Sequence, residues 1–172
     1  MGAGFHGGFG ATAGKVMTSK NEHKYESHKD YTREQILQAL HGVTLQSTKV
    51  EEAIRKGLIR LSVLGDELYE RYYGTDKGLA DRDKIYVRRS SMTLYSVVVH
   101  EGTHALDYRS GVPMKRVSSV EGELHAYKEE HYFQKVSGMK LEFANEDEIL
   151  IHVYLNYNEN SIKRRRKKDE CC

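Results

Sequence analysis

One segment near the middle of the chain constrains its fold more than any other. Residues 97–107 read VVVHEGTHALD, a His-Glu-x-x-His motif preceded by three valines. If the segment is helical, His100 and His104 lie one turn apart on the same face. The valines predict that this helix is buried. The chain must therefore fold around a helix that carries two imidazoles into its interior.

The motif contains the residue types that zinc-dependent hydrolysis requires. Two neutral imidazole nitrogens at this spacing can bind one Zn²⁺, and a carboxylate beside them can take a proton from water as it attacks a carbonyl group. The chain has 9 histidines, and a shuffled sequence of this composition would contain only roughly 0.05 such motifs. We therefore predict that His100 and His104 bind zinc and that Glu101 is the general base. The alternative is a solvated helix that carries two histidines.

Composition indicates one domain with tails. The chain has 172 residues, 38% of them hydrophobic, and a mean hydropathy of −0.68. We expect a flexible glycine-rich leader over 1–29, a domain over 30–160 and a basic disordered tail over 161–172. No apolar run is long enough to cross a membrane, and the first residues lack the features of a signal peptide. Both cysteines are at the end, Cys171 and Cys172, so any metal site in the domain must use histidine and carboxylate ligands.

The remaining pattern predicts an α+β fold that is mainly helical with a small sheet. Capping boxes predict helix starts at Thr32, Thr48 and Ser118, and the last of these helices should run to Gly138. A further helix should follow Asn145. Residues 85–87 read as a short strand, and residues 58–64 fit either a strand or a helix.

A catalytic zinc site usually has a third protein ligand. In metzincins it lies six residues after the second histidine, but Ser110 occupies that position here, and Asp107 stands where a glycine is expected. The other common arrangement takes a glutamate from a downstream helix. The candidates are Glu121, Glu123, Glu129 and Glu130, with His125 a weaker one.

Glu123 is the favoured third ligand. Glu121 can be explained as the partner of Ser118 in a capping box. Glu123 has no such explanation, and on a helix it shares a face with Ala126 and Tyr127, which suit packing against a neighbouring helix. A carboxylate on that face needs a partner, and zinc would supply one. Glu121 remains the main alternative.

The segments 100–107 (HEGTHALD) and 123–127 (ELHAY) resemble the gluzincin type of zinc metallopeptidase. More narrowly, they are similar to zincin-like metallopeptidase domains of bacterial polymorphic toxins, and the glycine-rich stretch 4–10 is similar to the junctions before such domains. The resemblance covers roughly residues 85–135. It implies a zincin fold with an active-site helix, a substrate-binding edge strand and a glutamate-bearing helix. It also implies one zinc ion per chain, held by His100, His104 and Glu123, with Glu101 as the base.

One position departs from the family pattern. The aspartate usually found four residues after the ligand glutamate is replaced by Tyr127, which leaves histidine orientation to another group such as Asp107. Tyr127, His125 and His131 are candidates for polarising a substrate carbonyl, although each is more often a core or surface residue.

The resulting expectation is a zinc metallopeptidase that acts on a protein or peptide, as a toxin or effector with a possible cognate immunity protein and a dedicated secretion route. The alternatives are an inactive zincin-like scaffold that binds a partner, and a module that acts through the basic run of its tail, residues 163–168.

Membrane contact is expected only if the tail cysteines are lipidated. No nucleic acid is expected as a partner, because the tyrosines form no stacking pattern.

Overall fold

The computed structural model describes residues 32–157, so the predicted leader and basic tail lie outside the described residues. The described part has the expected α+β fold, with more helix than strand. Its helices are α4 (Arg33–Leu40), α5 (Leu45–Arg55), α6 (Asp66–Tyr73), α7 (Leu94–Arg109), α8 (Met114–Val117), α9 (Val120–Ser137) and α10 (Glu146–Tyr157). None of these helices has the length and apolar character needed to span a bilayer.

The sheet has three strands, β1 (Arg60–Leu64), β2 (Gly78–Asp81) and β3 (Lys84–Arg88), in the order β1-β3-β2. β1 pairs with β3 in parallel, and β2 pairs with β3 as an antiparallel hairpin. The central strand contains the predicted segment 85–87, and its side chains alternate in burial, with Ile85 and Val87 fully covered. Because β2 is last in the strand order and pairs with β3, it lies at an edge of the sheet.

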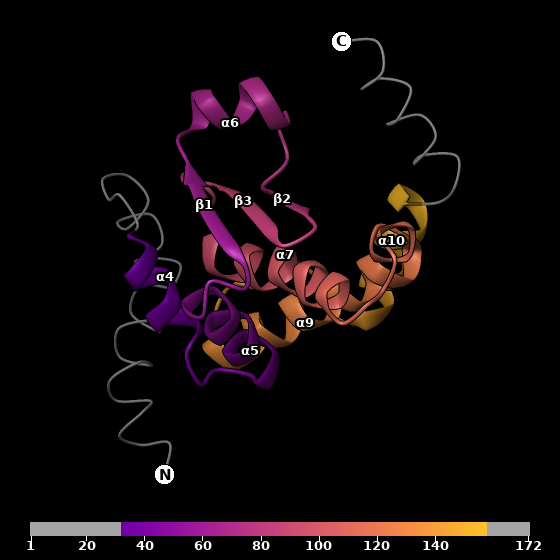
Figure 1. The fold of residues 1–172 in the computed structure, drawn as a ribbon. Helices are drawn as coiled ribbons and strands as arrows, with labels where there is room; N and C mark the ends of the chain where they lie inside the picture. Colours follow the sequence, from indigo (N-terminus) through magenta and orange to yellow (C-terminus); the bar gives the residue numbers. More distant parts are fainter. Residues whose placement is uncertain (1–31, 158–172) are drawn as a thin grey trace.

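Helix α7 is the centre of the fold. Figure 1 shows the sheet on one side of it and α9 on the other, with α4 and α5 near one end. Every residue from Leu94 to Ala105 is buried. A helix that is covered on all sides needs no polar stripe, which explains the run of valines at 97–99. The core consists of this helix together with apolar side chains of α4, α5, β3 and α9, including Ile36, Leu37, Ile54 and Phe133.

Several predicted element boundaries are confirmed. Thr32 and Gln35 form a reciprocal capping box at the start of α4. The amide of Glu148 donates to Asn145 Oδ1 at the start of α10. Helix α9 ends at Gly138, which adopts the left-handed conformation. The segment whose pattern was ambiguous, residues 58–64, forms β1 from Arg60 onwards.

Two predicted helix starts are wrong. Helix α5 begins earlier than Thr48 because Thr44 and Ser47 form the capping box instead. Helix α9 is capped by Ser119, whose side chain accepts from the Gly122 amide, while the Ser118 hydroxyl donates to the preceding turn at Met114. In both places a neighbouring hydroxyl residue competes for the same role, and tertiary packing decides between them.

Gly102 lets α5 and α7 approach closely. A Cβ atom at this position would lie 2.4 Å from Cγ1 of Val50, far inside van der Waals contact. The motif helix can therefore pack against α5 only because this residue has no side chain.

Gly102→Ala should lower the free energy of unfolding by about 1–2 kcal/mol, because overpacking outweighs the better helix propensity of alanine. In a Val50→Ala background the two shortest contacts are removed and only the Cβ atom of residue 50, 3.2 Å away, remains, so the same substitution should destabilise the protein much less. Urea unfolding of the four proteins in this cycle measures both effects. A destabilisation of equal size in both backgrounds would contradict the proposed contact.

Candidate metal centre

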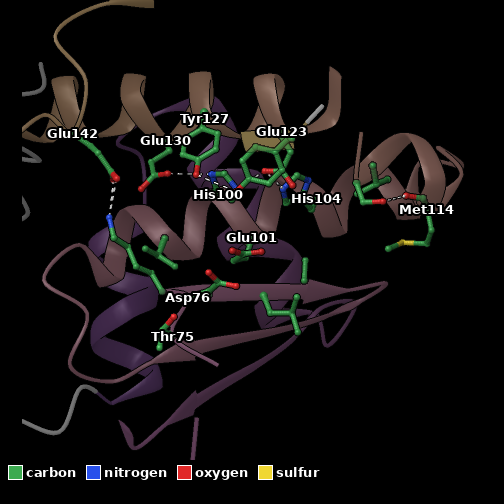
Figure 2. A pocket seen from close by; sticks show the side chains of 18 residues that line it. Thr75, Asp76, His100, Glu101, His104, Met114, Glu123, Tyr127, Glu130 and Glu142 are labelled. Atoms are coloured by element: carbon green, nitrogen blue, oxygen red, sulfur yellow. Dashed lines mark hydrogen bonds and ion pairs between the residues drawn. The ribbon is translucent and has the colours of Figure 1, made fainter. Parts of the chain in front are cut away.

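Helix α7 presents His100 and His104 on one buried face. Their imidazole rings lie one turn apart, with centroids 5.0 Å from each other in an edge-to-face arrangement. Both residues are less than 10% exposed. The helical spacing expected from the motif is therefore present, and both Nε2 atoms point toward α9 (Figure 2).

Glu123 on α9 completes the cluster. Its Oε2 lies 3.5 Å from Nε2 of His100 and 3.5 Å from Nε2 of His104. The three candidate ligand atoms all lie within 4.8 Å of one another. The structure thus brings the three predicted ligands together in a group that could hold a metal ion.

The competing candidates for the third ligand lie elsewhere. Glu121 is exposed and pairs with Arg116 at 3.1 Å, so it neither caps α9 nor faces the cluster. His125 pairs with Asp107 and lies 4.0 Å from Glu129. Glu130 is close to His100 but contacts the other ring nitrogen, which gives it a different role.

Glu130 orients the His100 ring. Its Oε2 lies 3.1 Å from Nδ1 of His100, and both side chains are buried. Because a carboxylate can only accept a hydrogen bond, Nδ1 carries the hydrogen and donates it. When the ring is neutral, Nε2 therefore has a free lone pair directed at the cluster, the tautomer that metal binding requires.

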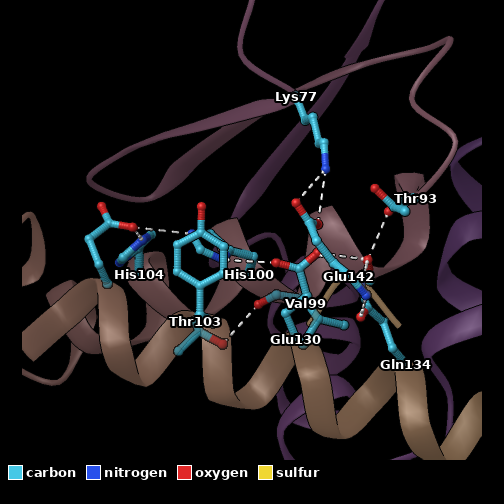
Figure 3. A network of polar contacts seen from close by, with 12 residues as sticks. Lys77, Thr93, Val99, His100, Thr103, His104, Glu130, Gln134 and Glu142 are labelled. Carbon is cyan, nitrogen blue, oxygen red and sulfur yellow. Dashed lines mark hydrogen bonds and ion pairs between the residues drawn. The ribbon is translucent and has the colours of Figure 1, made fainter. Parts of the chain in front are cut away.

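A chain of polar side chains in turn holds Glu130 (Figure 3). The Ser96 hydroxyl donates to Glu130 Oε1 at 2.8 Å, and Gln134 Nε2 donates to Ser96 Oγ at 3.0 Å. Gln134 Oε1 accepts from the backbone amide of Glu142, whose carboxylate binds Lys77. The network therefore connects the buried imidazole to the rim of the site.

Asp107 does not orient the ligand histidines. The structure places its Oδ2 2.8 Å from Nδ1 of His125, a residue of α9. The Nδ1 atom of His104 is buried and has no hydrogen-bond partner among the described residues. Asp107, one possible orienting group from the sequence, therefore does not take this role; Glu130 takes it, for His100 alone.

Burial and the hydrogen bonds between histidines and carboxylates set the electrostatics of the cluster. Burial favours a neutral His100, but hydrogen bonds to Glu123 and Glu130 outweigh burial and hold the pKa of His100 well above its usual value. Burial likewise acts to raise the pKa of Glu123, but its contacts with His100 and His104 prevail and lower that pKa to about 2. Glu123 is thus a carboxylate at neutral pH, the form that can bind a cation.

Glu101 faces the cavity beside the cluster (Figure 2). Its side chain is 8% exposed, and its carboxylate makes no hydrogen bond or ion pair within residues 32–157. Burial raises the pKa of Glu101 to about 7, against the opposing effect of His100 and His104. A cation held by the cluster would favour the ionised form of Glu101, because opposite charge offsets the cost of burial.

The cavity lies between the motif helix, α9 and edge strand β2, and has a volume of about 380 Å³. Gly78 at the start of β2 packs against α7 so closely that a Cβ atom there would lie 2.6 Å from Val97 Cγ1 and 2.9 Å from Glu101 Oε1. Glycine at this position lets the edge strand run directly past the Glu101 carboxylate. The backbone of β2 therefore forms one wall of the site.

Aromatic side chains from α9 and α10 close another wall. The Tyr127 ring packs edge-on against His100, with centroids 4.4 Å apart. Its hydroxyl lies 3.4 Å from the Tyr157 hydroxyl and 3.3 Å from Nε2 of His152. Of the three residues predicted as candidates for polarising a carbonyl, Tyr127 lines the cavity, whereas His125 and His131 do not.

Sequence reasoning did not find all of this site. The orienting role of Glu130 was missed, although it lies two helical turns after Glu123 and so shares its face. Tyr157 and the segment Thr75–Lys77 also line the cavity, and no periodicity or motif marked them. They reach the site through the packing of α10 and the approach of β2, which are long-range features.

Glu123→Ala should weaken zinc binding by orders of magnitude, because it removes one of three protein ligands. Glu121→Ala is the matched control. Glu121 lies outside the cluster, so the zinc affinity should be unchanged, and loss of its exposed ion pair should lower the stability by only about 0–1 kcal/mol. Zinc titration with a competing chromophoric chelator, on variants shown to be folded by circular dichroism, measures both. Equal affinity of the two variants would remove Glu123 from the centre.

Glu130→Gln should lower zinc affinity by about 10–100-fold, because loss of an orienting carboxylate typically has this effect. Glu129→Gln, one position earlier on the same helix, should have no measurable effect. The same titration compares them. If Glu130→Gln bound zinc as tightly as the unmodified chain, the hydrogen bond to His100 would have no role in presenting Nε2.

Comparison of the chain with family models, with curated proteins and with solved structures gave no match. Two imidazole nitrogens and one carboxylate oxygen converge in a buried position, and a second carboxylate, which has no partner among residues 32–157, lines the same cavity. This group could hold a metal ion.

Proposed function

We propose that the chain is a zinc-dependent metallopeptidase of the zincin type. One observation carries the proposal: Nε2 of His100, Nε2 of His104 and Oε2 of Glu123 converge beside a cavity that the free carboxylate of Glu101 also lines. The order of residues supports it as well, because the base lies between the two histidines on one helix and the third ligand comes from a separate helix.

The donor set suits zinc. Two imidazoles and a carboxylate form a common ligand set of catalytic zinc sites, whereas magnesium and calcium prefer oxygen ligands alone. The absence of cysteine from residues 1–170 agrees with this set. Bound zinc would polarise the scissile carbonyl group and make water at the site more acidic.

The residues of the chain then have distinct roles in hydrolysis. The Glu101 carboxylate takes a proton from the attacking water and passes it to the nitrogen of the leaving amine as the peptide bond breaks. Glu130 keeps the His100 ring in the required tautomer. Burial raises the pKa of Tyr127 above its usual value, so its hydroxyl keeps its proton and can donate toward the scissile carbonyl oxygen; the Tyr157 side chain lines the same cavity.

The edge strand supports a peptide as the substrate. β2 has β3 on one side only, so the backbone groups on its other side are available for pairing with an extended chain. Because β2 runs past Glu101 and lines the cavity, a peptide paired with it would cross the site with its backbone near the cluster.

Two further expectations remain predictions. A toxin or effector role, together with an immunity protein as a partner, depends on the resemblance of the motif regions alone. A function of the basic tail concerns residues outside the described part of the chain. The main rival is an inactive scaffold of the same fold, which would bind a partner without hydrolysing it.

The Glu101→Gln variant distinguishes an active peptidase from an inactive scaffold. The variant should bind one zinc ion per chain, as the unmodified protein does, because all three ligands are retained. Hydrolysis of denatured casein should fall by several orders of magnitude, more than the ~10²–10⁴ of an ordinary general base, since Glu101 also positions the water. Metal analysis and a fluorescent casein assay measure the two quantities. Near-normal turnover in the variant would remove Glu101 from the mechanism, and absence of turnover in both proteins would favour the scaffold.

A further inference from the structure

The lining of the cavity carries an excess of negative charge. Five carboxylates contribute to it, against one lysine, Lys77. The carboxylates are those of Asp76, Glu101, Glu123, Glu130 and Glu142. With both ligand histidines neutral, as metal binding requires, the lining residues within 32–157 carry four net negative charges, of which two remain once a divalent cation is bound.

Three of these carboxylates have partners within the site. Glu142 binds Lys77 through both oxygens at 2.9 Å. Glu130 is held by His100 and Ser96, and Glu123 faces the two ligand histidines. The charges that are left over therefore belong to Glu101, which the proposed reaction uses, and to Asp76.

Asp76 has no role in the fold that the structure reveals. Its side chain is exposed and makes no hydrogen bond or ion pair with any residue between 32 and 157. It lies on the short segment between α6 and β2, two residues before Gly78, and Figure 2 shows it on the β2 side of the cavity, across from α9. A peptide paired with β2 would pass directly beside it.

A second carboxylate makes this side of the cavity select for positive charge. Glu101 is more than nine-tenths buried, lacks a partner in the described part of the chain and lines the same space. Two unpaired carboxylates in one cavity repel an acidic ligand, and a cationic group would relieve that repulsion.

We propose that the site selects peptides that carry an ammonium or guanidinium group close to the scissile bond, and that Asp76 binds this group. The proposal rests on the proposed peptidase function and names the substrate class for it. Asp76 is here a specificity residue: it contacts the substrate without taking part in the proton transfers assigned to Glu101.

Cleavage-site mapping tests the selectivity. The zinc-loaded full chain is incubated with a peptide library derived from a bacterial proteome, and the cut sites are read by mass spectrometry. Lysine and arginine should be enriched at one fixed position relative to the cut, and the Asp76→Asn variant should lose that enrichment. Asp81→Asn, at the other end of β2 and outside the cavity lining, should keep it. Cleavage by the unmodified chain with no basic preference would overturn the proposal and leave the peptidase function intact.

A binding measurement tests the contact between Asp76 and the cationic group without requiring cleavage. Zinc-loaded Glu101→Gln protein is titrated with fluorescein-labelled peptide pools, blocked at both ends, that hold lysine, norleucine, arginine, citrulline or glutamate at one fixed position. The lysine and arginine pools should bind about three- to tenfold more tightly than their neutral counterparts, and high salt should reduce the difference. Adding Asp76→Asn should abolish it, whereas adding Asp81→Asn should not.

Three further outcomes are informative. A pool with a free amino terminus and a neutral fixed residue distinguishes a terminal ammonium from a side-chain cation, and tight, Asp76-dependent binding of this pool would assign the contact to the peptide terminus. If the lysine and norleucine pools bound equally, Asp76 would have no role in recognition. If Asp76→Asn instead lowered the zinc content, Asp76 would be a metal ligand and the proposal would be wrong.

Discussion

The contact between helices α7 and α9 is the interaction on which the candidate centre depends. It brings two imidazoles of one helix against two carboxylates of the other, with all four side chains largely shielded from solvent. Burying isolated carboxylates is costly, so each must have a compensating partner. In the absence of a cation the raised pKa of His100 supplies that compensation, because a protonated imidazole lies between Glu123 and Glu130. A bound cation would replace this proton.

Both carboxylates lie on one face of α9, two helical turns apart, and Gln134 continues the same face by one more turn. One rigid helix therefore supplies a candidate ligand, the group that orients another ligand, and the amide that supports this group. A displacement of α9 relative to α7 would disturb all three contacts together. The close packing of Gly102 against Val50 on the opposite side of α7 leaves that helix little room to follow such a displacement.

Local sequence information was enough for the parts of the site that lie on single helices. The motif identified His100, Glu101 and His104, and the helical face shared with Ala126 and Tyr127 distinguished Glu123 from Glu121. The orientation of His100 by Glu130 depends on how α9 docks onto α7, which spacing within α9 cannot determine. Asp107, which the sequence offered as one possible orienting group, contacts His125 instead. The strand β1 was ambiguous for a similar reason, because its partner in the parallel pair, β3, lies beyond α6 and β2.

The position of β2 at the edge of the sheet has a consequence for how copies of this chain behave in solution. An unpaired strand edge can pair with the edge of another molecule and so begin aggregation. This edge is only four residues long, Lys77 precedes it, and Asp81 is its last residue. Short strands with charged ends are poor templates for stacking, so this geometry admits one extended peptide while discouraging the sheet from growing by repeated addition of strands.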